Sequence, residues 1–220
     1  MPSSSEASSS RTQPSLHGEE KNHIDARIYH RLMEGDRSSI VEICNRGSKL
    51  SDYVWTPNGS TVLHIAASAG QRDLVKWIVS EEPGLLDAPD SEGNLPTHIA
   101  VRTNQFEVVQ CLVELAKENV EQILRAENND KNTALHIALE NHHDKIASWL
   151  FQKCKPTFYL LNAQGISPLY LAVNRKLPLV KDMLDSGVGY FNLVQKTLTL
   201  PRAKSVVHAM ITARNQGAYM

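Results

Sequence analysis

The chain has 220 residues, of which 41% are hydrophobic, so it carries enough apolar material to bury the core of one large or two small domains. Its 23 basic and 24 acidic side chains leave a formal net charge of −1, which excludes binding of nucleic acid or anionic membranes through bulk positive charge. Three widely spaced cysteines, Cys44, Cys111 and Cys154, provide neither a disulfide framework nor a zinc site, and they favour a reducing compartment.

The first 23 residues begin M-P-S-S-S-E-A-S-S-S-R-T-Q-P-S and lack an apolar segment. Such a sequence buries too little surface to offset the entropy of ordering, so we expect residues 1–23 to form a disordered tail rather than a secretory signal. The best apolar run, residues 108–116, is interrupted by Gln110 and Glu114 and is shorter than the ~18 to 20 residues of a membrane span. We therefore expect no transmembrane segment in this chain.

The rest of the chain repeats itself. The stretch T-V-L-H at 61–64 recurs as L-P-T-H at 95–98, T-A-L-H at 133–136, S-P-L-Y at 167–170 and S-V-V-H at 205–208. The intervals between successive fourth positions are 34, 38, 34 and 38 residues, and a weaker copy, R-I-Y-H, lies at 27–30. A period in this range indicates a stacked-repeat protein.

Each unit is predicted to contain two short helices. Thr61 occupies the N-cap position of the first helix, where its hydroxyl can accept hydrogen bonds from first-turn amides, and this helix is expected to stop at Gly70. Pro96 and Pro168 stand at the first helical position, where a missing N–H costs nothing. The longer interval after His98 predicts one extra turn at the end of that unit's second helix.

The second helices carry large apolar residues at helical spacing. These are Leu74, Val75, Ile78 and Val79; Val108, Val109, Leu112 and Val113; and Ile146, Ala147, Leu150 and Phe151. Between units, three Asx residues precede the turn, and their side chains are expected to bond forward to backbone amides. These are Asp90, Asn128 and Asn162.

The recurring T-P-L-H-x-A pattern resembles the ankyrin family, from about residue 26 to residue 208. The resemblance implies an all-α ankyrin-repeat solenoid, made of stacked helix pairs joined by β-hairpin turns. About five repeats are expected in residues 24–203, with an incomplete sixth in 204–220. The positions that carry the repeat signature are Thr61, His64, Pro96, His98, Thr133, His136, Ser167, Pro168, Tyr170 and His208.

The stretches L-L-D-A-P-D-S-E-G-N-L-P-T-H-I-A (85–100) and S-P-L-Y-L-A-V (167–173) resemble plant ankyrin-repeat membrane proteins of the accelerated-cell-death type. In that family a cytosolic array precedes membrane helices, and its members act in defence and stress responses. The resemblance therefore implies a cytoplasmic array, and for longer relatives the cytosolic face of the plasma membrane. Because the sixth unit stops after its first helix, we expect the chain to be a fragment, a truncated gene product or a shortened isoform.

Histidines are the most tempting candidates for chemistry, but their placement favours a structural role. His64, His98 and His136 recur three residues after the N-cap position, and Tyr170 replaces the histidine in one unit. The resemblance implies that this ring ties the helix start to the adjacent hairpin. The H-x-x-x-E-N-H-H-D stretch at 136–144 lacks the three converging ligands of a zinc site. The sequence thus predicts no catalytic residue, no metal site and no cofactor.

Repeat arrays bind partners along an extended concave surface made of hairpin tips and first-helix ends. We call this surface the concave face, and its mixture of polar side chains suits a protein partner. Trp55 is either an aromatic anchor on this face or a packing residue of the first repeat. The predicted members are Trp55, Asn58, Ser60, Ser68, Glu92, Asn94, Arg102, Thr103, Asp130, Asn132, Glu140, Asn141, Gln164, Asn174 and Arg175.

The leading functional hypothesis is a protein–protein interaction module without catalytic activity, regulatory in plant stress or defence signalling. Two alternatives remain open from the sequence. The array is the regulatory part of a larger enzyme or channel, or this chain is a non-functional truncated form. The expected partners are proteins of unknown identity, and nucleic acid is not expected among them.

Overall fold

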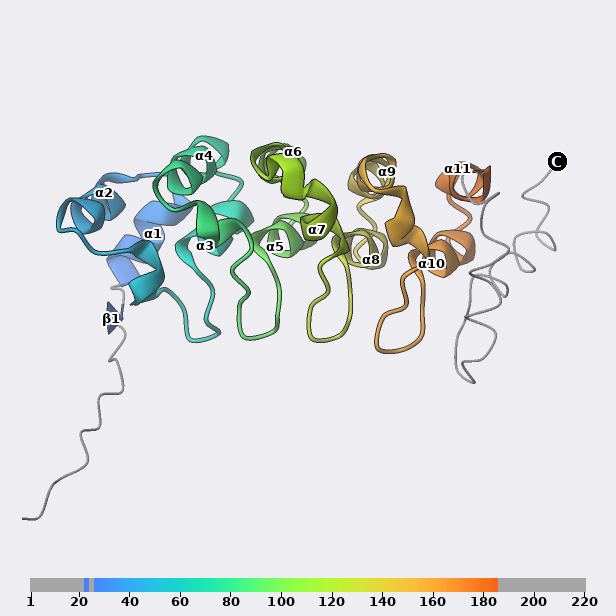
Figure 1. Ribbon diagram of the computed structural model, residues 1–220, viewed down its shortest axis with the longest axis horizontal. Coiled ribbons are helices and arrows are strands. Elements are labelled where there is room, and N and C mark those ends of the chain that lie inside the picture. Colours follow the sequence, from blue (N-terminus) through green and yellow to red (C-terminus); the bar gives the residue numbers. More distant parts are fainter. Residues whose placement is uncertain (1–21, 24–25, 186–220) are drawn as a thin grey trace, which may run out of the picture.

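The computed structural model describes residues 22–23 and 26–185, and it is an ankyrin-type solenoid that is almost entirely helical (Figure 1). The first helices of successive units stand in one row, the second helices stand in a second row, and hairpin loops project from the first row (Figure 1). The first-row helices are α1 (Ala26–Met33), α3 (Val62–Ser68), α5 (Pro96–Arg102), α8 (Ala134–Glu140) and α10 (Pro168–Asn174). The second-row helices are α2 (Ser38–Asn45), α4 (Arg72–Glu81), α6 (Phe106–Leu115), α9 (Asp144–Lys153) and α11 (Leu179–Asp185). The predicted all-α solenoid is confirmed.

The N-terminal end of the array differs from the predicted tail. Residues 22–23 form a strand, β1 (Asn22–His23), which pairs in parallel with β2 (Tyr53–Val54) in the first hairpin region. The predicted disordered tail of residues 1–23 is therefore too long by at least these two residues. Residues 1–21, and the predicted sixth unit at 204–220 with His208, lie outside the described residues.

The repeated histidines bind each helix start to the hairpin of the next unit. The Nδ1 atom of His64 accepts a hydrogen bond from the Thr61 amide at 3.0 Å, so its Nε2 carries the proton and donates to the Asn94 carbonyl at 2.8 Å. His98 and His136 make the same amide contact with the residue three positions earlier, and their Nε2 atoms face the carbonyls of Ala126 and Ile166 at 3.1 Å. These are the contacts that the family resemblance implies for a structural role of the rings.

The predicted capping of these helices by hydroxyl groups is only partly right. The Thr61 hydroxyl bonds to His64 Nδ1 at 2.9 Å instead of accepting from a first-turn amide, because the ring already occupies that position. Thr133 and His136 repeat this arrangement. Only where tyrosine replaces histidine does the cap follow the expected pattern: the Ser167 hydroxyl accepts from the Tyr170 amide at 3.2 Å.

The hairpins are held by the Asx residues as predicted. In each of three hairpins one Oδ1 accepts from two backbone amides, two and four residues further on, at 2.8–3.1 Å. Side chains then join neighbouring hairpins: Asn128 Nδ2 donates to Asn94 Oδ1 at 2.9 Å, and Asn162 Nδ2 donates to Asn132 Oδ1 at 2.9 Å. These bonds help to fix the stacking distance between units, since each unit supplies an acceptor to which an asparagine of the next unit donates.

The core is a continuous apolar layer between the two rows of helices. Alanines on the first helices, such as Ala66, Ala100 and Ala138, are fully buried and let neighbouring units approach closely. The predicted apolar positions of α4, α6 and α9 are all buried. Trp77 and Trp149 are half-buried and pack against this layer, as expected.

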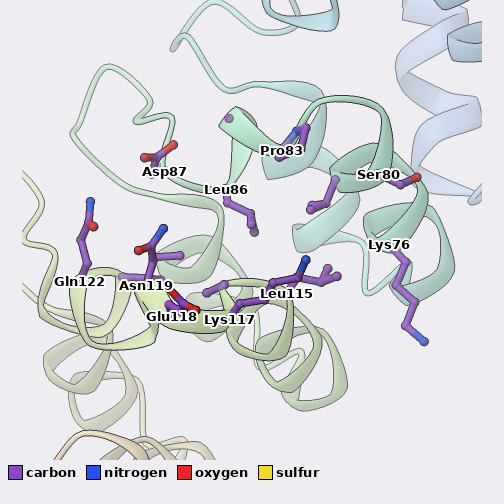
Figure 2. A pocket seen from close by; sticks show the side chains of 14 residues that line it. Lys76, Ser80, Pro83, Leu86, Asp87, Leu115, Lys117, Glu118, Asn119 and Gln122 are labelled. Atoms are coloured by element: carbon purple, nitrogen blue, oxygen red, sulfur yellow. The ribbon is translucent and has the colours of Figure 1, made fainter.

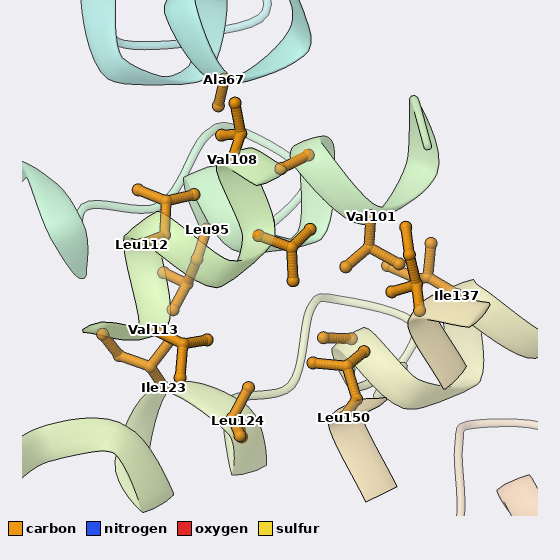
Figure 3. Close-up of a cluster of buried hydrophobic side chains, with 14 of the residues drawn as sticks. Ala67, Leu95, Val101, Val108, Leu112, Val113, Ile123, Leu124, Ile137 and Leu150 are labelled. Atoms are coloured by element: carbon orange, nitrogen blue, oxygen red, sulfur yellow. The ribbon is translucent and has the colours of Figure 1, made fainter. Parts of the chain in front are cut away.

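One unit exchanges two residues of the repeat pattern. Where its neighbours have a polar N-cap and a buried leucine, this unit has Leu95 and Thr97. Figure 3 shows Leu95 in the same apolar cluster as Leu112 and Val113. Thr97 is 1% exposed and its hydroxyl has no hydrogen-bond partner, so this unit loses one apolar contact and gains one unpaired polar atom.

The extra residues of the same unit do not lengthen its second helix. Helix α6 ends at Leu115, and Lys117 takes a left-handed conformation with φ +52° that no helix can continue through. The chain then forms η3 (Lys117–Asn119) and a separate helix, α7 (Val120–Arg125). In the neighbouring units the same place holds a single 3₁₀ turn, η2 (Pro83–Leu86) or η4 (Lys155–Tyr159), whereas η1 (Leu50–Asp52) precedes β2.

Candidate interaction surface

Most of the residues predicted for the concave face lie at its solvent side. The hairpin tips expose Asn58, Glu92, Asp130 and Gln164, and the first-helix ends expose Arg102, Thr103, Glu140, Asn141 and Asn174. Ser60, Ser68, Asn132 and Arg175 are half-buried. The tips are also joined by backbone bonds: the Ser91 amide donates to the Asn58 carbonyl at 3.0 Å, and the Ala163 amide donates to the Asp130 carbonyl at 2.8 Å. Consecutive units therefore bring their exposed polar groups into one line.

Two predicted members of the concave face are interior residues instead. Trp55 is 5% exposed, its indole Nε1 donates to the Leu50 carbonyl at 2.9 Å, and its ring contacts Tyr53. It therefore packs the first repeat and offers no anchor to a partner. Asn94 is fully buried because its amide bonds to Asp90 and its Oδ1 accepts from Asn128.

Arg102 is the cation at the centre of the concave face. Its Nη2 donates to Asn94 Oδ1 at 3.1 Å, and its Nη1 lies 3.7 Å from Glu92 Oε2. The buried Asn94 thus connects the hairpin frame to an exposed guanidinium. This contact holds Arg102 in one place before any partner arrives, which lowers the entropy cost of binding.

Glu140 occupies the equivalent position of the next unit. Partial burial raises the pKa of its carboxyl group, and the nearby Asp130 carboxylate raises this pKa further, whereas Arg102 lowers it. Its Oε2 accepts a long hydrogen bond of 3.5 Å from Asn132 Nδ2. The two acids and Arg102 together place charges of both signs within two adjacent units.

Arg175 is bonded to the preceding unit through both of its terminal nitrogens. Its Nη1 donates to the Leu139 carbonyl at 2.8 Å and its Nη2 pairs with Asp144 Oδ1 at 2.8 Å. Other side chains near this turn make equivalent bonds to the preceding unit: Gln105 Nε2 donates to the Ser68 carbonyl and His143 Nε2 contacts the Arg102 carbonyl. Arg175 therefore stabilises the stack at the end of the face.

Residues 22–23 and 26–185 contain no group of three histidine, cysteine or acidic side chains arranged to hold a metal ion. His142 is exposed at the turn between α8 and α9. Cys111 and Cys154 are buried, Cys44 is half-buried, and burial raises the pKa of all three thiols.

Within residues 26–185 every helix is too short, or too polar, to cross a bilayer. The array thus presents a frame of buried polar bonds and an outer surface of variable polar side chains.

Comparison with known proteins identifies close matches for this architecture. The family model described as "Ankyrin repeats (3 copies)" matches residues 32–123 and 114–193. The chain is 32% identical over 212 residues to Protein ACCELERATED CELL DEATH 6 of Arabidopsis thaliana, covering 86% of this chain and 31% of that protein. It is 27% identical over 203 residues to the Nuclear factor NF-kappa-B p105 subunit of Gallus gallus, covering 89% of this chain and 19% of that protein.

A shorter relative is matched along most of its length. I-Kappa-B like protein C2 of Microplitis demolitor bracovirus is 26% identical over 164 residues, covering 71% of this chain and 90% of that protein. The chain spans less than a third of the plant and chicken relatives. Since the family model covers most of the chain and the stacked helix pairs carry its repeat pattern, the chain belongs to the ankyrin-repeat family.

Proposed function

Ankyrin repeats are a protein–protein interaction fold, and we propose that this array binds a protein partner through its concave face. The observation that carries the proposal is a contrast between frame and surface. The frame positions keep their chemistry from unit to unit, with histidine or tyrosine at the helix start and Asx in the hairpin. The exposed first-helix end, by contrast, changes from Ser68 to Arg102 to Glu140 to Asn174. Identical scaffolding with changing exposed groups suits sequence-specific recognition.

The partner would meet a surface with a charged centre. Arg102 suits an acidic group, while Glu140 and Asp130 suit a basic group, and the polar hairpin tips supply hydrogen bonds around them. The partner's contacting segment therefore carries both signs of charge. This module acts by binding, and catalysis is assigned to none of its residues.

The similarity to Protein ACCELERATED CELL DEATH 6 supports a finer proposal, that the array acts in plant stress or defence signalling. It would do so on the cytoplasmic side of the membrane, as the regulatory part of a longer protein. The coverage of only 31% of that relative supports the idea that arrays of this type work beside other segments.

The test is a pull-down from plant cytosol and solubilised membranes with the full chain as bait. The decisive bait carries Arg102→Ala together with Glu140→Ala, and its matched control carries Arg46→Ala together with Glu42→Ala. The control removes an exposed arginine–glutamate pair from α2, in the second-helix row. Circular dichroism first establishes that all baits fold alike.

A partner lost by the Arg102/Glu140 variant and kept by the Arg46/Glu42 variant supports binding at the concave face. If both variants retain the same partners as the unmodified bait, the concave face is not the binding surface. The defence assignment is tested separately, by asking whether the partner's abundance changes after pathogen challenge.

A further inference from the structure

A second surface lies on the opposite side of the same units. A groove of about 780 Å³ separates the α4–η2 segment of one unit from the end of α6, η3 and α7 of the next (Figure 2). We call it the insert groove, because η3 and α7 contain the extra residues of this unit. Lys76, Val79, Gly84, Leu86 and Asp87 line one side of it, and residues between Lys117 and Ile123 line the other.

The groove exists because the chain breaks after α6. Lys117 is held at φ +52°, and this reversal directs η3 and α7 alongside η2. A non-glycine residue in this conformation costs about 1 kcal/mol relative to glycine. The five lining residues from Lys117 to Ile123 thus form a wall that the neighbouring units, with their single 3₁₀ turns, do not build in the same way.

The floor of the groove is apolar and firmly packed. Val79 and Ile123 are 6% and 3% exposed, and Leu86 is 9% exposed, so a visiting side chain meets a rigid surface. Gly84 leaves the space above this floor open: a Cβ atom added there meets no heavy atom within 4 Å. A rigid apolar floor with open space above it accepts one apolar side chain at little ordering cost.

The rim carries four charged side chains. Lys76 and Lys117 are basic, Asp87 and Glu118 are acidic, and none of the four belongs to an ion pair within residues 26–185. Figure 2 shows Asp87 on the opposite side of the groove from Lys76, so the rim has an acidic end and a basic end. The amides of Asn119 and Gln122, beside the acidic end, can bond to a peptide backbone.

We propose that the insert groove docks a peptide segment of a partner protein, in which one apolar side chain is flanked by an acidic and a basic residue. The apolar side chain sits over Val79 and Leu86, the acidic residue faces Lys76, and the basic residue faces Asp87. Charge complementarity at both ends selects this occupant over a purely acidic, basic or apolar one, each of which leaves at least one rim charge desolvated and unpaired. The open, elongated shape suits a chain segment.

The test fills the groove without disturbing the fold. Gly84 is exposed, its φ lies outside the left-handed region, and a Cβ atom added there has free space, so Gly84→Leu places an alkyl group in the groove. Gln152→Leu on α9 is the matched control, since it adds the same side chain at an exposed site outside the groove. Urea unfolding establishes that both variants keep the stability of the unmodified chain.

The probe is a phage-displayed library of random dodecapeptides, selected on the full chain and synthesised for fluorescence anisotropy. We expect selected peptides to share an apolar residue flanked by opposite charges and to bind Gly84→Leu about tenfold more weakly, a loss of about 1.4 kcal/mol, while Gln152→Leu binds normally. Selection on a Lys76→Glu variant should enrich peptides in which a basic residue replaces the acidic residue that faces Lys76.

The proposal is overturned if no peptide is enriched, or if every enriched peptide binds Gly84→Leu as tightly as the unmodified chain. Peptides that lose affinity only for the Arg102/Glu140 variant would belong to the concave face and would also count against the groove. The concave-face proposal is tested with the Arg102/Glu140 variant and the groove proposal with Gly84→Leu. Failure of one proposal can therefore be distinguished from failure of the other.

Discussion

Acidification should weaken this fold through its buried histidines. His98 and His136 are fully buried, and burial lowers the pKa of each ring from 6.5 to about 4. Hydrogen bonds to carbonyl oxygens oppose this shift in both rings, and the nearby Arg102 guanidinium lowers the pKa of His98 further. In the unfolded chain the same rings take up a proton near their ordinary pKa.

The direction in which stability changes with pH depends on whether the folded or the unfolded state binds the proton more tightly. Because the pKa values are lower in the folded state, the unfolded state binds more protons between about pH 6.5 and pH 4, so stability is complete above this window and falls as the pH falls through it. At pH 5 an unfolded ring is almost fully protonated and a folded ring is almost fully neutral. The linkage relation then gives a loss of about 2 kcal/mol per ring, and about 4 kcal/mol for both, between pH 7.5 and pH 5.

Such a loss is a large share of the 5–15 kcal/mol that stabilises a typical domain. Burial also lowers the pKa of His64, which adds to the loss in the same direction. The raised pKa of Glu140 acts in the opposite direction, since a carboxyl group that is protonated more readily in the folded state favours folding on acidification. Glu140 is exposed to solvent, so its effect is the smaller one.

The assay is urea unfolding followed by circular dichroism at constant ionic strength, at several pH values from 7.5 to 5. The unmodified chain is compared with His136→Gln, which removes one titrating ring. The variant is less stable at pH 7.5, since it loses bonds to Thr133 and Ile166, but it should lose about 2 kcal/mol less than the unmodified chain on going to pH 5. Equal losses in the two proteins, at equal m-values, would refute the idea that this ring stays neutral when buried.

Three further changes test the frame, each by urea unfolding at neutral pH. Thr97→Val should stabilise the chain by about 1 kcal/mol, since it removes a buried hydroxyl that has no partner, and a loss of stability would mean that the hydroxyl is bonded. Asn128→Ala should destabilise it by about 2–4 kcal/mol, because two backbone amides and Asn94 Oδ1 each lose a hydrogen bond. Gly70→Ala should cost about 1–2 kcal/mol, since φ is +76° there and the new Cβ lies 2.6 Å from Gln105 Oε1; no change would show that the turn is free to adjust.

The repeat pattern predicts the frame well because its determinants are local. A histidine three residues after an extended residue can reach that residue's amide in the first helical turn, and His64, His98 and His136 make the contact that the family resemblance implies. The side chains of Asn128 and Asn162 accept hydrogen bonds from amides two and four residues further on in their own hairpins. These contacts can therefore also be predicted from the local sequence. Local geometry of this kind is contained in a single repeat.

The errors fall where contacts peculiar to one unit, or a bond between two units, decide the outcome. Trp55 has no equivalent in the other hairpins, and its burial depends on the Leu50 carbonyl and the Tyr53 ring, which precede it in an irregular first unit. The sequence pattern places Asn94 at a hairpin tip, where a side chain is expected to be exposed. In the structure its Oδ1 atom accepts a hydrogen bond from Asn128, which lies 34 residues further along the chain. The separate helix α7 depends on a chain reversal at Lys117, which adopts a left-handed conformation. A lysine in the sequence does not predict this conformation, because glycine is the residue that usually adopts it.

Apart from Trp55, these departures lie in the unit that contains α5, α6 and α7. The unit that begins at Ser91 exchanges polar and apolar residues at Leu95 and Thr97, and Leu95 compensates by joining the apolar cluster that Ile123 of α7 also enters (Figure 3). The extra residues are thus tied into the core rather than appended to it. Their outer side forms a wall of the insert groove, while Arg102 of the same unit stands at the centre of the concave face.

We predict that the unit which contributes to both proposed surfaces couples them. The Thr97 hydroxyl and the left-handed Lys117 both weaken this unit relative to an ideal repeat, so it is the place where stacking is most easily adjusted. An occupant of either surface stabilises the unit and so favours occupancy of the other, since coupling between sites is reciprocal. Because Thr97→Val strengthens the unit without touching either surface, it should raise affinity at both and reduce the coupling between them. A calorimetric titration of each site, with the other filled, measures this directly, and equal coupling in both chains would show that the two surfaces are independent of that unit's stability.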